Sequence, residues 1–280
     1  MKVLAVGAAG VSAGLVVKAL AARGVEVRGL VHSPDREAVA RHNGAGEVVV
    51  ADLLDRNALR EAVNGVDGVF HIIPAFVADE AATGVTLVHV AQEAGVGRFV
   101  FSSVYHPSLA DLSNHRDKQP AEQALYDGDM QFTILQPAMF MSQLDGVVDQ
   151  ARRTGTISGP YSAASQMTYV DFRDVAEVAA TSFTSDEFAN GTFELAAPGT
   201  YSREDLAALL SGMLDKPVHA ETVKPQLPDQ MPPALRDGLT KMFDHYDDRG
   251  FRGGNAFVLT QMLGRPPKAV PDYLAELLGG

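Results

Sequence analysis

The chain has 280 residues, of which 46% are hydrophobic and 21% are charged, and it contains no cysteine. This composition is typical of a folded protein with one large domain, alone or with a smaller companion, and it argues against disorder. The missing cysteines exclude disulfides, thiolate nucleophiles and cysteine-ligated zinc, and the net charge of −12 opposes direct binding to nucleic acid.

The amino terminus allows two interpretations. Lys2, the apolar stretch 3–17 and the small residues around Ala21 resemble a secretory signal peptide. However, three glycines interrupt the apolar stretch, and cleavage would remove the first strand of a well-formed βαβ pattern, so a strand, glycine loop and helix are expected instead. No stretch reaches the roughly 18 apolar residues of a membrane-spanning helix. We therefore expect a cytoplasmic protein without membrane association.

The first half of the chain alternates short apolar runs with amphipathic segments. Near-continuous apolar runs predict strands, covered on both faces, over residues 2–6, 25–31, 47–50, 68–72, 98–102 and 132–135. The segments between them predict helices over residues 10–23, 34–41, 56–64, 79–94 and about 114–126, and Gly24, Gly65 and Gly95 follow three of these at the expected stop position. This alternation predicts an α/β fold with a Rossmann-type doubly wound parallel sheet.

After Gln136-Pro137 the pattern becomes less regular. Helices are expected over residues 138–153, 171–182 and 203–214, the last capped by Ser202, and short strands over 167–170 and 192–195. From Lys216 onward frequent prolines predict short helices joined by rigid turns. We predict an NAD(P)-binding Rossmann domain over residues 1–155, to which segments at about 165–198 return, and a smaller, mostly helical substrate-side region over 199–280.

A glycine-rich loop, Gly7-Ala8-Ala9-Gly10-Val11-Ser12-Ala13-Gly14, joins the first strand to the first helix. Residues without large side chains let the backbone approach a pyrophosphate, and the start of a helix offers free N–H groups and a partial positive charge. The strand before the loop, the helix after it and the further βα units predict dinucleotide binding by Gly7, Ala9, Gly10, Val11 and Ser12. The alternative is an ordinary tight turn in another doubly wound protein.

The end of the second strand bears on the choice of dinucleotide. An acidic residue about twenty residues beyond the loop would bind the ribose of NAD, and this strand has none at its end. His32, Ser33 and Arg36 could instead bind a 2′-phosphate, although Asp35 lies close enough to weaken this argument. We therefore expect NADP(H) in preference to NAD(H).

Several short motifs, in order and at matching spacing, carry a resemblance across nearly the whole chain. They are the glycine loop, Ala51-Asp52-Leu53-Leu54-Asp55, the strand 98–103, Lys118 with Glu122, the segment 133–137, the segment 169–176, and the C-terminal Asp244-His245-Tyr246-Asp247 with 263–267. In these the chain resembles the NmrA-like group of atypical short-chain dehydrogenases/reductases. The group contains both hydride-transferring enzymes and proteins that bind NAD(P) as redox sensors.

The resemblance implies roles for individual positions. Asp52 and Leu53 would lie by the adenine and Ile72, Ile73 and Pro74 near the ribose, Lys118 would contact the nicotinamide ribose, and Gln136, Pro137 and Ala138 would line the cofactor pocket. Three departures stand out. The group usually has Arg where this chain has Gln136, and its NADP-binding members commonly have Arg after the second strand, where this chain has His32. The classical catalytic Tyr, four residues before the Lys, is Asn114 here.

Other candidates follow the fifth strand. One of Ser102 and Ser103 is expected to face the cofactor, because adjacent strand residues point oppositely. Either Tyr105 or His106 could donate a proton to a substrate. The alternative is that Tyr105 packs under the loop and that His106 lies at the surface. Lys118 could likewise be a solvated helix residue paired with Glu122, four positions on.

Histidines and acidic runs give no metal-ligand pattern. His71 lies in an apolar strand and is therefore expected to be a core histidine with hydrogen-bond partners. Residues Asp244–Asp248 are expected to form the solvated end of a helix. No metal is therefore expected.

Two functions of different classes fit these patterns. The first is an NAD(P)H-dependent oxidoreductase, with Lys118, Tyr105 and His106 as candidate catalytic residues, that reduces a quinone-like or other conjugated organic acceptor. The second is a non-catalytic NAD(P)-binding redox sensor that acts through a protein partner. An isomerase or dehydratase is disfavoured because those relatives also use the missing Tyr. We expect a monomer or homodimer.

Overall fold

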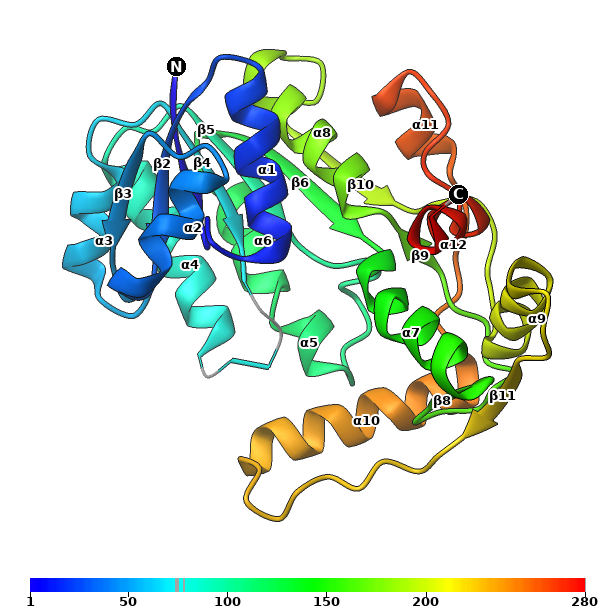
Figure 1. Cartoon of the computed structure of the whole chain (residues 1–280). Helices are drawn as coiled ribbons and strands as arrows, with labels where there is room; N and C mark the ends of the chain where they lie inside the picture. Colours follow the sequence, from blue (N-terminus) through cyan, green and yellow to red (C-terminus); the bar gives the residue numbers. More distant parts are fainter. Residues whose placement is uncertain (74–75, 78, 280) are drawn as a thin grey trace. The chain divides into compact units, whose positions relative to one another are not determined.

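The computed structural model describes residues 1–73, 76–77 and 79–279 (Figure 1). The chain divides into two compact units. The first contains residues 1–136 and 175–194, and the second contains residues 137–174 and 195–280. Each unit is described by itself below.

The first unit is built around a seven-stranded sheet with the strand order β10-β6-β5-β4-β1-β2-β3. Its strands are β1 (Lys2–Val6), β2 (Glu26–Val31), β3 (Glu47–Val50), β4 (Gly68–Ile72), β5 (Arg98–Ser102), β6 (Gln131–Pro137) and β10 (Gly191–Leu195). All neighbouring pairs from β3 to β6 are parallel. The order reverses at β1 and β4, so the topological switch point, where doubly wound sheets bind ligands, lies beyond the carboxyl ends of these two strands. The predicted Rossmann-type fold is confirmed.

Helices cover both faces of the sheet (Figure 1). On one face α3 (Arg56–Val63), α4 (Glu80–Glu93) and α6 (Gln119–Tyr126) pack on the strands, and Leu59, Leu87 and Leu125 join Val69, Phe99 and Ile134 in a buried core. On the other face lie α1 (Val11–Ala22) and α8 (Phe172–Thr184), which packs so closely on β4 that a Cβ at Gly68 would lie 2.7 Å from Phe183. Gly24, Gly65 and Gly95 have positive φ, as predicted for residues just after helices.

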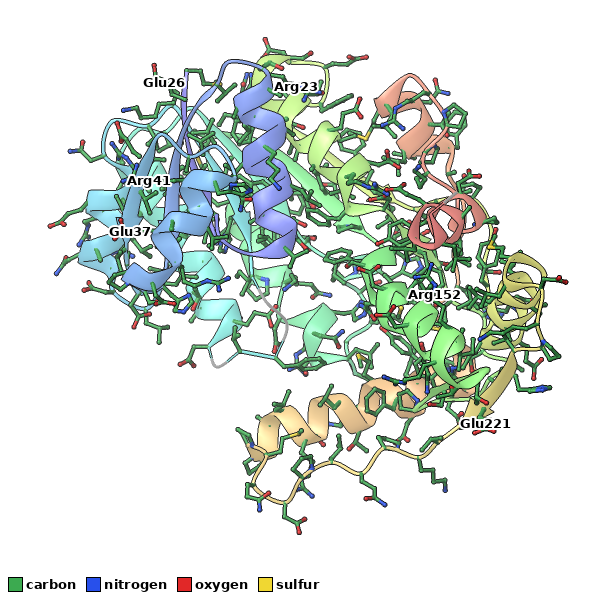
Figure 2. The ribbon with its side chains drawn as sticks, viewed as in Figure 1. Arg23, Glu26, Glu37, Arg41, Arg152 and Glu221 are labelled. Carbon is green, nitrogen blue, oxygen red and sulfur yellow. The ribbon has the colours of Figure 1, made fainter. Side chains whose placement is uncertain are left out.

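The remaining helices of the first unit are short. They are α2 (Glu37–His42), which follows the 3-10 turn η1 (Pro34–Arg36), and α5 (Ser113–Arg116). The single helix predicted over about 114–126 is therefore two helices, with Lys118 in the junction. Of the two charged residues labelled on α2 in Figure 2, Arg41 is exposed and Glu37 is half-buried.

The second unit has two small parallel sheets, β8 (Thr156–Gly159) with β11 (His219–Thr222) and β7 (Met139–Phe140) with β9 (Tyr169–Val170). Its helices are the 3-10 turn η2 (Met141–Gln143), α7 (Leu144–Thr154), α9 (Arg203–Leu214), α10 (Pro233–Arg249), α11 (Phe257–Leu263) and α12 (Val270–Leu278). Ser202 caps α9 as predicted, through a capping box with Asp205.

Two predictions for the second unit are wrong in part. The helix predicted over 138–153 begins only at Leu144, because Met139 and Phe140 form strand β7, which pairs with β9, and residues 141–143 form the turn η2. The proline-rich end contains a strand and the 17-residue helix α10 as well as short helices. Pro232 and Pro233 do not break α10, since they lie at its N-cap and first turn, where no intrahelical N–H is needed.

Within the described ranges, no helix combines the length and the apolar character needed to cross a bilayer.

Candidate cofactor and active site

The loop between β1 and α1 has the geometry of a phosphate cradle. Gly7 has a φ of +72°, which favours glycine, and its carbonyl accepts the Gly10 N–H at 2.7 Å, which closes a tight turn. The N–H groups of Gly7 and Ala8 donate to Leu30 O in β2 at 2.9 and 3.1 Å. These bonds hold the loop against the end of the neighbouring strand.

The start of α1 is open to a ligand. Gly10 is its N-cap and supplies no side-chain cap, so the first N–H groups of the helix have no partner within it. The Val11 side chain is 79% exposed. A Cβ at Gly10 would lie 3.1 Å from Gly7 O, so a side chain at this position would force the tight turn to shift. Unpaired N–H groups and the helix dipole suit an anionic diphosphate, and these residues therefore fit a dinucleotide.

Asn43, at the end of α2, supports this loop, and the sequence analysis missed it. Its buried amide donates to Ala8 O at 2.9 Å, and Gly14 lies so near that a Cβ there would be 2.5 Å from Asn43 Nδ2. The third glycine of the loop is thus explained by helix packing. A lone Asn in a helical segment gives no sequence signal of this contact.

The residues after β2 lie beside the same loop. Arg36 donates from Nη2 to Ala9 O at 3.0 Å, which brings its guanidinium to the glycine loop. Ser33 is hydrogen-bonded to the Asp35 carboxyl, and this bond, with the nearby charges of His32 and Arg36, holds the pKa of Asp35 below its usual range. The structure thus brings Arg36 to the glycine loop, while the ionised Asp35 adjoins it in the chain.

The carboxyl ends of β3 and β4 carry the next predicted positions. Asp52 forms a local turn, accepting the Leu54 N–H on Oδ1 at 2.9 Å, and its side chain is exposed, whereas Leu53 is half-buried. Ile72 ends β4 and Ile73 is buried beyond it. Pro74 lies outside the described residues.

Lys118 is buried, and its ammonium reaches the end of β4. Its side chain is 5% exposed and forms an ion pair with Glu80, which is 3% exposed and comes from the first turn of α4. Lys118 Nζ also donates to Ile73 O at 3.2 Å. The alternative of a solvated lysine paired with Glu122 is therefore wrong, because the chain turns between α5 and α6 and directs Lys118 toward α4.

His71 lies beneath this pair in the core of the sheet. It is fully buried and stacks on Phe101 at 5.7 Å, but neither ring nitrogen has a hydrogen-bond partner among the described residues. Burial, together with the charge of Lys118, lowers the pKa of His71 to about 3. The prediction of a core histidine is correct in location, and the expectation of hydrogen-bond partners for it is wrong.

Glu122 joins the ends of β5 and β6. Its Oε1 accepts hydrogen bonds from Ser103 Oγ at 2.5 Å and from Gln136 Nε2 at 2.9 Å. Burial raises the pKa of the Glu122 carboxyl, and the two hydrogen bonds oppose this. Gln136, for which the resemblance implied an Arg, is thus a neutral donor. Ser102 points elsewhere, and its buried hydroxyl has no partner in the described part of the chain.

Tyr105 and His106 lie next to each other after β5, with ring centroids 4.0 Å apart. His106 has a φ of +55° and its Nδ1 lies 2.9 Å from Glu194 Oε1, while its carbonyl contacts His115 Nδ1 at 3.1 Å. Burial and, to a smaller extent, the charge of Glu194 raise the pKa of Tyr105, which makes its hydroxyl a weaker acid.

The predicted residues Pro137 and Ala138 belong to the second unit. Both are buried, and Ala138 donates its N–H to Leu195 O. In the first unit, by contrast, the candidate residues gather at the carboxyl ends of neighbouring strands. The glycine loop, Arg36 and Ser103 follow β1, β2 and β5, Lys118 contacts Ile73 beyond β4, and Gln136 lies near the end of β6. That set offers phosphate donors, a cation and a hydrogen-bonding network at one edge of one sheet.

Comparisons with known proteins identify the family and the fold of the chain. A model of the NmrA-like family matches residues 1–268. The NAD(P)H azoreductase of Xenophilus azovorans is 24% identical over 278 residues, which is 97% of this chain and 96% of the relative. The (4-alkanoyl-5-oxo-2,5-dihydrofuran-3-yl)methyl phosphate reductase of Streptomyces griseus is 28% identical over 261 residues, 89% of each. Among solved structures, the quinone oxidoreductase QOR2 of Escherichia coli, complexed with NADPH, superposes with a TM-score of 0.84 at 21% identity, over 99% of this chain and 100% of that one.

Proposed function

Because the chain belongs to the NmrA-like family, we propose that it is an NADPH-dependent reductase of a quinone-like or other conjugated organic acceptor. The observation that carries the proposal is the pairing of an uncapped helix start behind a glycine turn with a buried lysine beyond β4, the next strand in the sheet. Two relatives that align over most of their length are named as reductases, one of them NAD(P)H-dependent.

In this proposal each cluster binds one part of the cofactor. The N–H groups at the start of α1, beside Gly7, Ala9, Gly10 and Ser12, bind the pyrophosphate. His32, Ser33 and Arg36 bind the 2′-phosphate, which favours NADP(H) over NAD(H). Asp52 and Leu53 lie by the adenine, and the carboxyl end of β4 lies near the ribose. Pro137 and Ala138 remain predicted contacts.

Lys118 is the proposed contact to the nicotinamide ribose. An ammonium has three N–H donors, and Glu80 and Ile73 O use two of them, so one remains for a ribose hydroxyl. When bound, NADPH supplies the hydride. The protein's part is to hold donor and acceptor together and to exclude water.

The proton has a different source from that in the classical reductases. Asn114 occupies the position of their Tyr and cannot donate a proton as an acid. Of the two remaining candidates His106 is favoured, because its imidazole is half-exposed and its Nδ1 lies 2.9 Å from Glu194 Oε1. A conjugated acceptor lowers the demand on this acid, since its oxyanion is delocalised and water can protonate it.

Turnover tests the proposal. Purified protein is mixed with NADPH and a panel of quinones and azo compounds, and loss of the reduced nicotinamide absorbance is followed. We expect acceptor-dependent oxidation of NADPH, faster than that of NADH at equal concentration. If the protein binds NADPH but none of the acceptors causes NADPH oxidation, the proposed reductase function is overturned.

Asn114 also motivates the second candidate, a redox sensor, because a sensor needs no acid. If the chain is a sensor, its affinity for a partner protein should change with the NADPH/NADP⁺ ratio, and no acceptor should cause it to oxidise NADPH. For either function we place the protein in the cytoplasm, which cell fractionation tests.

A further inference from the structure

The Glu80–Lys118 pair points beyond the binding roles given above. Lys118 lies in no regular element, since α5 ends at Arg116 and α6 begins at Gln119. A lysine side chain has many rotamers, so a single orientation must be imposed by its contacts. Those contacts are the Glu80 carboxylate and Ile73 O.

Glu80 is itself held on both sides. One carboxylate oxygen binds Lys118, and the other accepts the N–H of Phe76 at 3.2 Å. Glu80 lies in the first turn of α4, where the helix dipole favours a negative charge. Phe76 and Asp79, near it in the chain, have φ of +62° and +55°, an uncommon conformation for residues other than glycine. The carboxylate thus connects the backbone after β4 to Lys118.

Other charged groups around the pair do not replace Glu80. Asp117 adjoins Lys118 in the chain but binds Arg116, and Glu122 binds Ser103 and Gln136. His71, from β4, is uncharged near neutral pH because burial lowers its pKa to about 3. Burial also raises the pKa of the Glu80 carboxyl, and Lys118 counteracts this.

We propose that Glu80 is a positioning residue, which holds the Lys118 ammonium at the carboxyl end of β4 so that its remaining N–H meets the nicotinamide ribose. This rests on the proposed function, because it presupposes that Lys118 contacts the cofactor. A buried ion pair is a weak source of stability compared with apolar packing. Its place beside the switch point of the sheet agrees with a role in binding.

The experiment compares Glu80→Gln, Glu80→Asp and a control on the same helix, Glu93→Gln, whose exposed carboxylate pairs with Arg56 and Arg60. Dissociation constants for NADPH are measured by nucleotide fluorescence, and kcat and KM by acceptor turnover. We expect Glu80→Gln to raise the Kd and KM for NADPH by about tenfold, the loss typical of a hydrogen bond to a charged group. Glu80→Asp keeps the carboxylate and should restore part of the affinity, and Glu93→Gln should match the unaltered protein.

A double-mutant cycle shows whether Glu80 acts through Lys118. In a Lys118→Met background, Glu80→Gln should change the Kd for NADPH less than twofold, because the group that it positions is gone. Each single substitution leaves one buried charge of the pair without its partner, whereas the double variant contains neither charge. The double variant can therefore be measured even if thermal melts show that Glu80→Gln alone unfolds.

The outcomes separate this proposal from the proposed function. If the unaltered protein oxidises NADPH but Glu80→Gln and Glu93→Gln have the same Kd, the positioning role is overturned and the reductase stands. The positioning role is also overturned if Glu80→Gln lowers the affinity for NADPH equally in the protein with Lys118 and in the Lys118→Met variant. If the unaltered protein binds no NADPH, both proposals fail.

Discussion

Gly10 stands where the first turn of α1 faces the proposed diphosphate. Its φ of −77° is open to any residue, but a Cβ would lie 3.1 Å from Gly7 O, so a side chain would force the turn in front of the helix start to shift. We therefore expect Gly10→Val to weaken NADPH binding at least tenfold, about 1.4 kcal/mol, with a small change in melting temperature. Calorimetric titration measures the affinity.

Gly212→Ala in α9 is the matched control for Gly10→Val. A Cβ at Gly212 meets no atom within 4 Å. Alanine should stabilise that helix by about 0.5–1 kcal/mol, because glycine is the poorer helix former, and should leave NADPH affinity unchanged. Undiminished binding by Gly10→Val would remove the glycine loop from the cofactor site.

Arg36 determines the choice of cofactor in our proposal. Its guanidinium lies at the glycine loop, where it can bind the 2′-phosphate that only NADP(H) carries. Arg36→Ala should lower the affinity for NADPH by about tenfold and that for NADH far less, so the preference should disappear. Arg41→Ala is the control, since Arg41 is exposed on α2 and binds Gly46 O. Equal losses for both nucleotides would contradict the assignment.

The sequence alone could identify the residues of this site that stand in local motifs. The glycine loop and Arg36 follow their strands directly, and a strand–loop–helix pattern predicts their place. Glu80 and Asn43 could not be found in this way, because each acts on a residue 38 or 35 positions distant. Which carboxylate meets Lys118 depends on how α4 and α6 pack, and sequence spacing suggested Glu122.

At the scale of elements, strand β4 contains a group that makes folding depend on pH. His71 has a pKa of about 3 in the fold and an ordinary value of 6.5 in the unfolded chain. Below about pH 6 the unfolded state therefore binds a proton that the folded state does not. The stability from the neutral His71 is fully present above pH 6.5 and is lost as the pH falls toward 3.

We expect His71 to make the free energy of unfolding fall by about 1.4 kcal/mol per pH unit between about pH 5.5 and 4. His71→Phe removes this titrating group and its two unpartnered nitrogens. The slope of its unfolding free energy against pH should therefore be smaller than that of the unaltered protein by about 1.4 kcal/mol per pH unit in this range. His71→Leu serves if the larger ring overpacks the core. Urea unfolding at several pH values gives the slopes, and parallel slopes for all three proteins would refute the effect.

The predicted strands of the first unit agree with the structure to within one or two residues, because buried parallel strands are continuous apolar runs. The second unit was harder to predict. Its strands β8 and β11 are four residues each and mostly half-buried or exposed, so they have no apolar run to reveal them. Helix α10 was missed because its surroundings are rich in proline, although proline is tolerated at a helix start.

At the scale of the whole molecule, charge separates the candidate functions further. With 35 acidic residues against 23 lysines and arginines, the chain has a net charge of −12, and a protein that neutralises DNA phosphates needs a positive surface. A sensor of this composition would have to act through a protein partner. A reductase needs only a local positive potential for the phosphates of its cofactor, and Arg36 and the start of α1 supply it.

We therefore expect no binding to duplex DNA, with or without NADPH. Fluorescence anisotropy of a labelled duplex of about 20 base pairs checks this at about 50 and 150 mM salt, because phosphate contacts are strongest at the lower concentration. Any specific or nonspecific contact with the phosphates would appear as an anisotropy rise that weakens as salt increases. Such a rise, especially one that changed with the NADPH/NADP⁺ ratio, would favour a sensor that acts on DNA directly and would count against a purely enzymatic role. A flat signal at both concentrations, together with turnover of an acceptor, leaves the reductase as the function that the charge and the site both support.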